Sequence, residues 1–520
     1  MKIQKWFTSI LVLTFLTMPL ASVSASSGTT DEYSLVFDTA KYTMKTLTLN
    51  GKSITYRAYE NIVYVKYPVD TNYEIMNIYV PEEYYEDKSI GNYNAKTAPI
   101  FLPNTVGGYM PGAPGSPGQD QNGSPNAALV ALSKGYVVAE PGARGRTTQD
   151  KNSLYTGKAP ACIVDLKAAV RYLRYNQKRI PGDTEKIISN GTSAGGALSA
   201  LLGASGNNKD YEPYLKAIGA ADARDDIFAV SSYCPITNLD NADMAYEWLF
   251  NGINGYSRMM APGPLPPDRL SPPVNQGMPA APPKLPEVKG TMTADQIKVS
   301  DELKALFPAY LNDLGLKKSD GTALTLDANG DGPFKDYVKS FVVASAQKAL
   351  DHGTDLSGLT WITIKDRIVT DIDFDKYLNY ATRMKSAPAF DALDLSNPEN
   401  SLFGTATVNA QHFTQFSKDH STVGGSLAAA SIVKLLNPMN YIGTKGTTTA
   451  QHWRIRHGAV DKDTALAIPV ILATKLENKG FDVDFAVPWG QGHGGDYDLN
   501  ELFVWIDKVC APHQETKPVQ

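Results

Sequence analysis

Short apolar runs alternate with amphipathic helical segments in two parts of the chain. The helical pattern is clearest where Ile163, Leu166, Val170 and Leu173 repeat at helical spacing and form one apolar face. Apolar runs of about four to eight residues bounded by turn residues are typical of buried strands. Such runs are found at 75–80, 98–103, 136–140, 186–190, 227–234, 452–458 and 482–488. Strands that alternate with helices predict an α/β fold with a mostly parallel sheet, which binds ligands at the carboxyl ends of its strands.

The segment before this alternation is expected to be β-rich. Asn50-Gly51 separates two strand-like runs, 47–49 and 53–56, and is a strong signal for a hairpin with a tight turn. A further strand is expected at 62–65.

The alternation stops between residues 236 and 404. Ten prolines fall within 262–286, too many for a packed helix or a central strand, and they indicate a semi-extended surface arm. We therefore predict a large lid domain at 236–404, inserted between two core segments at 26–235 and 405–520.

Residues 1–25 have the composition of a secretory signal peptide. Lys2 and Lys5 precede an apolar run at 6–20, and Val23-Ser24-Ala25 provides a small-residue cleavage site. The run is too short for a membrane span. Cleavage after about Ala25 is expected to release a secreted protein that does not stay on the membrane.

Charge and cysteine content exclude some function classes. The 520 residues carry a net charge of −5 without a basic stripe, so nucleic-acid binding is not expected. Three cysteines are too few for a disulfide framework. Whether any two of Cys162, Cys234 and Cys510 form a disulfide is left open.

The run Gly191–Gly195 matches the G-x-S-x-G nucleophile elbow, with Ser193 at its centre. It follows a predicted strand and precedes a helix of small residues. A serine on such a sharp turn has strained backbone angles, so the residues two positions away must lack side chains. The alternative is a glycine-rich turn whose serine only caps the helix.

An α/β-hydrolase orders its catalytic triad as serine, acid and histidine. His493 follows the last predicted strand, and Asp461 follows the one before, so both occupy the expected places; Asp463 is the competing acid. The other histidines precede the acid or lie in the tail: His352, His412, His420, His452, His457 and His513. The residues of the proposed triad are therefore Ser193, Asp461 and His493.

An acyl-transfer site also needs N–H donors for the oxyanion. Ala194 follows the serine at the start of a helix, and Gly107-Gly108 follow the strand at 98–103. In this fold the loop after that strand supplies the second donor. We expect an oxyanion hole made by Ala194 with Gly107 or Gly108, although Gly107-Gly108 could equally be a plain turn.

No cofactor is required for this chemistry. Asp327, Asn329 and Asp331 copy the first positions of a calcium loop, but position 12 is Val338 instead of the bidentate glutamate. An Asx-rich turn is therefore favoured, with calcium as the alternative.

Several longer blocks of sequence are not explained by the general requirements of a strand, helix or turn. These blocks resemble the bacterial tannases, or tannin acyl hydrolases, and the resemblance extends over nearly the whole mature chain. These blocks are 103–109, 190–196, 242–248, 383–385, 398–400, 452–458 and 495–499.

The resemblance implies an α/β-hydrolase that hydrolyses gallate and protocatechuate esters of tannins through an acyl-enzyme. It matches Ser193, Asp461 and His493 to the catalytic triad. It also matches Lys385, Glu399 and Asp463 to contacts with the galloyl hydroxyls. A feruloyl esterase or general carboxylesterase is the alternative. Preference for simple gallates or polygalloyl sugars is left open, as is the oligomeric state.

Overall fold

The computed structural model describes residues 32–120, 123–259 and 287–511. The signal peptide predicted at 1–25 and the surface arm predicted at 262–286 lie outside the described residues. The described residues from Tyr33 onward form one compact unit. Among the helices that the structure describes, none is both long and apolar enough to cross a membrane.

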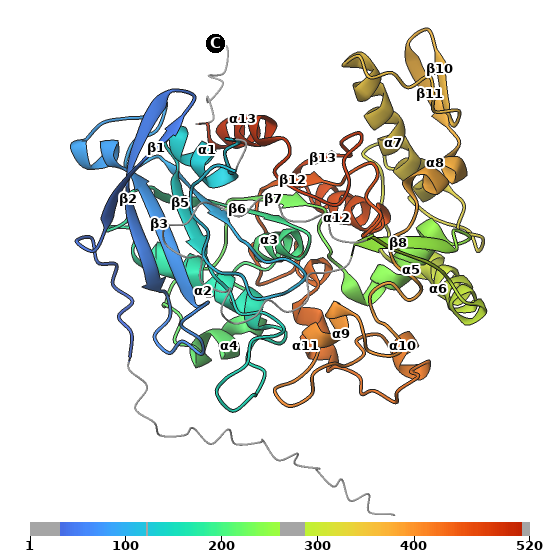
Figure 1. The fold of residues 1–520 in the computed structure, drawn as a ribbon, viewed down its shortest axis with the longest axis horizontal. Helices are drawn as coiled ribbons and strands as arrows, with labels where there is room; N and C mark the ends of the chain where they lie inside the picture. The colour runs from blue at the N-terminus through green and yellow to red at the C-terminus, as the bar shows by residue number, and fades with distance from the viewer. Residues whose placement is uncertain (1–31, 121–122, 260–286, 512–520) are drawn as a thin grey trace, which may run out of the picture. The chain divides into compact units, whose positions relative to one another are not determined.

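A nine-stranded sheet with the order β1-β2-β3-β5-β4-β6-β7-β12-β13 forms the centre of the fold (Figure 1). Its strands are β1 (Thr43–Leu49), β2 (Lys52–Val63), β3 (Ile75–Pro81), β4 (Pro99–Pro103), β5 (Val137–Pro141), β6 (Asp183–Thr192), β7 (Ala229–Tyr233), β12 (His452–Arg456) and β13 (Asp482–Ala486). From β5 to β13 every neighbouring pair is parallel, whereas β1, β2 and β3 pair in antiparallel fashion. The predicted α/β fold with a mostly parallel sheet is confirmed.

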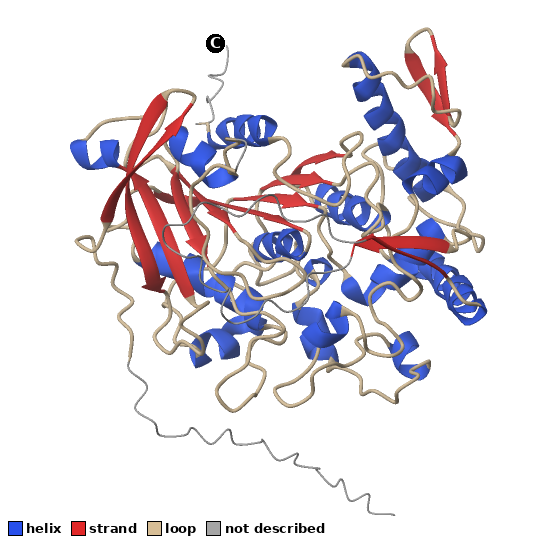
Figure 2. Ribbon diagram, in the orientation of Figure 1, coloured by secondary structure: helices blue, strands red, loops and turns tan. Residues whose placement is uncertain are grey.

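Helices cover both faces of this sheet (Figure 2). Two successive residues of β4 pack into different parts of the hydrophobic core. Ile100 belongs to the part that contains α2 (Ala161–Tyr175) and α3 (Ala194–Ala204). Phe101 belongs to the part that contains α1 (Ala127–Ser133) and α13 (Leu499–Cys510). Burial on both faces explains why the parallel strands read as unbroken apolar runs.

The predicted hairpin is confirmed, with Asn50 and Gly51 at φ 51° and 75° between β1 and β2. The separate strand expected at 62–65 is wrong. β2 continues to Val63 through a register shift beside Asn61, whose φ is 58°. The bulge changes the alternation of the strand, and for this reason one strand looks like two in the sequence.

The segment from 236 to 404 lies between β7 and β12 in the chain. It contains two two-stranded sheets, β8 (Gly255–Met259) with β9 (Glu287–Thr291) and β10 (Ile362–Lys365) with β11 (Ile368–Ile372). Its helices are α5 (Leu239–Phe250), α6 (Ala294–Asp313), α7 (Pro333–Asp351), α8 (Phe374–Ala381) and α9 (Pro398–Leu402). None of these strands joins the main sheet. The domain boundaries and a lid movement stay predictions.

The remaining helical elements connect the core strands. They are η1 (Glu82–Glu86), η2 (Lys209–Tyr211), α4 (Glu212–Ala217), α10 (Gln415–Asp419), α11 (Ala430–Leu435), η4 (Pro438–Asn440) and α12 (Ala467–Asn478).

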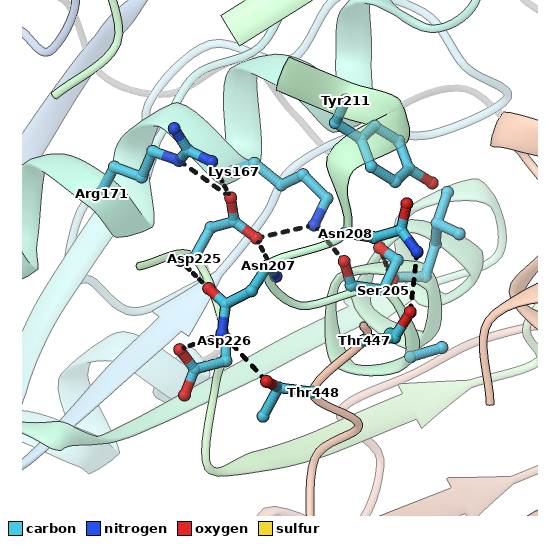
Figure 3. A network of polar contacts seen from close by, with 12 residues as sticks. Lys167, Arg171, Ser205, Asn207, Asn208, Tyr211, Asp225, Asp226, Thr447 and Thr448 are labelled. Carbon is cyan, nitrogen blue, oxygen red and sulfur yellow. Dashed lines mark hydrogen bonds and ion pairs between the residues drawn. The ribbon is translucent and has the colours of Figure 1, made fainter. Parts of the chain in front are cut away.

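A buried ion network closes the end of α3 that is far from Ser193 (Figure 3). The Lys167 amine donates to Ser205 O at 2.7 Å and to Asp225 Oδ1 at 2.9 Å. Arg171 donates to the other oxygen of Asp225 at 2.8 Å, and Asn207 N donates to Oδ1 at 2.7 Å. Burial raises the pKa of Asp225, but Lys167 and Arg171 outweigh it and the pKa falls below its usual range. The network therefore holds α2 and the end of α3 in one place.

Candidate active site

Ser193 lies at the turn between β6 and α3, where the sequence predicts the nucleophile. Its φ of 60° and ψ of −122° are strained for a residue with a side chain. A Cβ on Gly191 would collide with the carbonyl of Gly195, and a Cβ on Gly195 would lie 2.6 Å from Asn104 Oδ1. The steric reason for glycine at both positions is therefore confirmed.

The loop that follows β4 is tied to this turn. Asn104 Nδ2 donates to Asn190 O at 3.2 Å and to Gly195 O at 3.1 Å. Within the described residues, the N–H groups of Gly107, Gly108 and Ala194 donate to no protein acceptor. Free donors on two elements joined by Asn104 are what an oxyanion hole needs.

His493 and Asp461 are brought together from the loops that follow β13 and β12. His493 Nδ1 donates to Asp461 Oδ2 at 2.9 Å, and Asp461 Oδ1 accepts from Asp463 N at 2.8 Å. Burial lowers the pKa of His493, but the Asp461 carboxylate, with help from Asp463, raises it well above its usual value. Burial likewise raises the pKa of Asp461, which His493 nevertheless holds well below its usual range. Asp461 is therefore the acid that orients the imidazole.

The His493 loop lies against the nucleophile turn. Gly495 contacts Thr192 so closely that a Cβ would collide with the threonine hydroxyl, and Cys234 Sγ donates to Gly494 O at 3.3 Å. No hydrogen bond joins the Ser193 hydroxyl to His493 among the described residues, and His493 Nε2 has no hydrogen-bond partner there. The contact between Ser193 and His493 that proton transfer needs is therefore not formed here, and such bonds often tighten only when substrate binds.

Other histidines are engaged elsewhere. His412 Nδ1 is 2.8 Å from Asp391, and His452 Nδ1 is 2.8 Å from Asp482. His457 is closer to the site, because its Nδ1 lies 3.7 Å from Asp461 Oδ2. Burial lowers the pKa of His457, so it is neutral beside the Asp461–His493 pair.

Lys385, Glu399 and Asp463 form a charged group next to His493. Lys385 Nζ makes an ion pair with Asp463 Oδ1 and lies 3.9 Å from the centre of the Phe390 ring. The other oxygen of Asp463 is 3.3 Å from His493 Nε2. Burial raises the pKa of Glu399, although Lys385 acts in the opposite direction. Glu399 is therefore easier to protonate than an ordinary glutamate.

Helix α5 positions this group, a role that the sequence alone does not indicate. Tyr246 Oη accepts from Lys385 N at 3.2 Å and donates to Lys462 O at 2.6 Å. Glu247 forms a fully buried ion pair with Arg383 at 2.6 Å. These contacts fix the backbone on both sides of the Lys385–Asp463 pair. They also explain what the sequence block at 242–248 does in the structure.

The calcium-like loop is an Asx turn in this structure. Asp327 Oδ1 accepts from Asn329 N at 2.8 Å and from Asp331 N at 3.0 Å. Asp331 also pairs with Lys335 at 2.7 Å. Calcium binding here stays a prediction.

All three cysteines, Cys162, Cys234 and Cys510, are free and buried, so none of them forms a disulfide. In the part of the chain that the structure describes, the group with the geometry to hold a metal is Cys234, Asp461 and His493. Two of these residues belong to the predicted triad, so this group needs no metal to explain it.

Comparisons with known proteins agree with this geometry. A family model described as BD-FAE matches residues 108–256, and no curated protein matches the chain. The crystal structure of Fusobacterium nucleatum tannase is 54% identical with a TM-score of 0.87, covering 92% of this chain and 100% of that one.

Two structures of tannin acyl hydrolase, one with ethyl gallate and one with 3,4-dihydroxybenzoate, are each 48% identical. Their TM-scores are 0.83 and 0.84, and each alignment covers 92% of this chain and 99% of the other. The chain belongs to the tannase (tannin acyl hydrolase) family of carboxylic ester hydrolases, within the α/β-hydrolases.

Proposed function

We propose that this enzyme hydrolyses galloyl and protocatechuoyl ester bonds of tannins and releases the free phenolic acid. The observation that carries the proposal is the Lys385–Asp463 ion pair, whose carboxylate reaches to 3.3 Å from His493 Nε2. It puts groups that can bind phenolic hydroxyls directly beside the acid–base residue. Relatives bound to ethyl gallate and 3,4-dihydroxybenzoate support the same substrate class.

In the proposed mechanism, His493 accepts the Ser193 proton while the serine oxygen attacks the ester carbonyl. Asp461 keeps the proton of His493 on Nδ1 and stabilises the imidazolium. The N–H groups of Ala194 and of Gly107 or Gly108 bind the oxyanion. His493 then protonates the leaving alcohol, and water releases the acid from Ser193 by the same steps.

Ring recognition follows from the charges at the site. Adjacent phenol groups are both donors and acceptors, and an amine with two carboxyl groups can satisfy them together. Lys385 donates and Asp463 accepts, while Glu399 is a third polar group whose pKa burial raises. A ring without hydroxyls would leave these buried groups unpaired, which disfavours its binding.

Comparing kcat/KM for methyl gallate, methyl ferulate and p-nitrophenyl acetate tests the proposal. We expect methyl gallate to be preferred clearly over the other two. A preference for ferulate would instead favour a feruloyl esterase, and no preference would favour a general carboxylesterase. Gallate ester turnover that persists in Ser193→Ala would contradict the assigned nucleophile.

Export is a separate part of the proposal. The support is the pattern of residues 1–25, with two lysines, an apolar run and a cleavage site after Ala25. N-terminal sequencing of the protein recovered from culture medium should begin at Ser26. Protein that stays in cells with Met1 in place would contradict export.

A further inference from the structure

A cavity of about 430 Å³ lies beside Ser193, and none of the three predicted ring contacts lines it. Its lining includes the nucleophile turn, the loop that follows β4, and two carboxyl groups, those of Glu140 and Asp496. Lys385, Glu399 and Asp463 are absent from this lining. The cavity therefore opens to the nucleophile independently of the charged group around Lys385.

The strand order explains this separation. Glu140 belongs to β5, which lies on one side of β6, with β4 between them. Asp461 and His493 follow β12 and β13, which lie on the other side of β6 (Figure 1). Ser193 directly follows β6, the strand that lies between β5 with Glu140 and the strands that precede Asp461 and His493.

Glu140 has no polar partner where one is expected. Glu140 is only 5% exposed, and its carboxyl group makes no hydrogen bond or ion pair with the described residues. Neither of its oxygens is among the fully enclosed side-chain atoms without a partner, because the carboxyl group lines the cavity. It packs against Gly115, where a Cβ would collide with Oε2. The carboxyl group is therefore open to the cavity and available to a polar ligand that enters it.

The protonation state of Glu140 suits a hydroxyl ligand. Burial, and then the charge of Asp496, raises the pKa of Glu140 to about 8. The group is therefore mostly protonated near neutral pH and can donate through its O–H while it accepts through the other oxygen. Asp496 is already engaged, because its Oδ1 accepts from Asn190 Nδ2 at 3.0 Å.

We propose that this cavity receives the alcohol part of the ester, and that Glu140 hydrogen-bonds a hydroxyl group of a polyhydroxy alcohol such as a sugar. The inference rests on the proposed galloyl esterase function, in which the acyl ring is bound on the Lys385 side. Glu140 is thus a specificity-determining residue that distinguishes sugar esters from esters of small alcohols.

The test compares kcat/KM for galloyl glucose and for methyl gallate in wild type, Glu140→Ala and Glu140→Gln. We expect wild type to favour galloyl glucose, and Glu140→Ala to lower the ratio of the two values roughly ten-fold, the effect of one lost buried hydrogen bond. Glu140→Gln keeps a donor and an acceptor and should retain most of the ratio. The matched control Asp482→Asn, remote from the cavity, should leave the ratio at the wild-type value.

Ser116, an exposed residue at the cavity, provides a second variant that does not disturb the core. Ser116→Trp should fill the cavity and lower the same ratio, even if Glu140→Ala fails to fold. If Glu140→Ala folds and its ratio of kcat/KM values is unchanged, the inference is overturned. If Glu140→Ala is unfolded, an unchanged ratio in Ser116→Trp overturns it instead. In both cases the galloyl esterase function is unaffected. A wild type that hydrolyses neither ester would overturn both.

Discussion

Asp463 lies between Lys385 and His493, so replacing it is expected to shift the pH dependence of the reaction in one direction. One of its oxygens pairs with Lys385, and the other is 3.3 Å from His493 Nε2. Asp463→Asn keeps the shape and removes the negative charge. The imidazolium is then less stabilised, so the pKa of His493 falls.

The size of this effect can be worked out from the distance. Two unit charges 3.3 Å apart interact by about 1 kcal/mol in a water-like dielectric and about 5 kcal/mol at an effective dielectric of 20. Lys385 offsets much of the Asp463 charge, so the smaller value applies. About 1 kcal/mol corresponds to roughly one pKa unit.

The assay is the pH profile of kcat/KM. Neutral His493 is the active base, so the acidic limb of the profile reports its pKa in the free enzyme. In Asp463→Asn this limb should move about one unit toward lower pH, and the same shift should appear with p-nitrophenyl acetate, which has no ring hydroxyls. Asp482, the exposed residue that pairs with His452, provides the control. The acidic limb of the pH profile should not move in Asp482→Asn. A limb that stays in place or moves to higher pH would refute the proposed influence of Asp463 on His493.

Three other predictions concern the turn, the ring site and the scaffold. Gly195→Ala should lower kcat about a hundred-fold or more, because the new Cβ would displace Asn104 and the loop that supplies a proposed oxyanion donor. A kcat at the wild-type level in steady-state kinetics would contradict this. Lys385→Met should lower the preference for methyl gallate over methyl benzoate by roughly ten- to a hundred-fold, measured by kcat/KM, and an unchanged preference would count against its role. Lys167→Met should lower the free energy of unfolding by about 3–5 kcal/mol in denaturant titrations, because it leaves Asp225 buried without its amine; a loss below about 1 kcal/mol would contradict the network's role.

The parallel sheet and the nucleophile turn could be predicted from the sequence because their causes are local. Apolar runs report strands buried on both faces, and the glycines around Ser193 report a turn that admits no side chains. The pairing of Asp461 with His493 followed from chain order, because the carboxyl ends of neighbouring parallel strands meet at one edge of the sheet.

The environment of Lys385 could not be predicted from its neighbours in sequence. The contacts that fix it come from Tyr246, 139 positions away along the chain, and from Asp463. Glu399 looks like an ordinary acid in the first turn of a short helix, and only the packing around α9 shows that it is buried. Resemblance to a family supplied these residues, and tertiary structure supplied their physical reason.

The position of Glu140 could not be predicted from its neighbours in sequence either. In the sequence it ends an apolar strand, where an acid usually reaches solvent. Only the order of β5, β4 and β6 in the sheet brings it to a cavity beside Ser193.

Trapping the acyl-enzyme tests the central proposal, nucleophilic catalysis by Ser193, most directly. The enzyme is mixed with methyl gallate, quenched in acid within one turnover, digested and analysed by mass spectrometry. We predict a galloyl group on the peptide that contains Ser193, and none on that peptide in Ser193→Ala. A galloyl adduct on another residue, or one that forms equally in Ser193→Ala, would contradict the account.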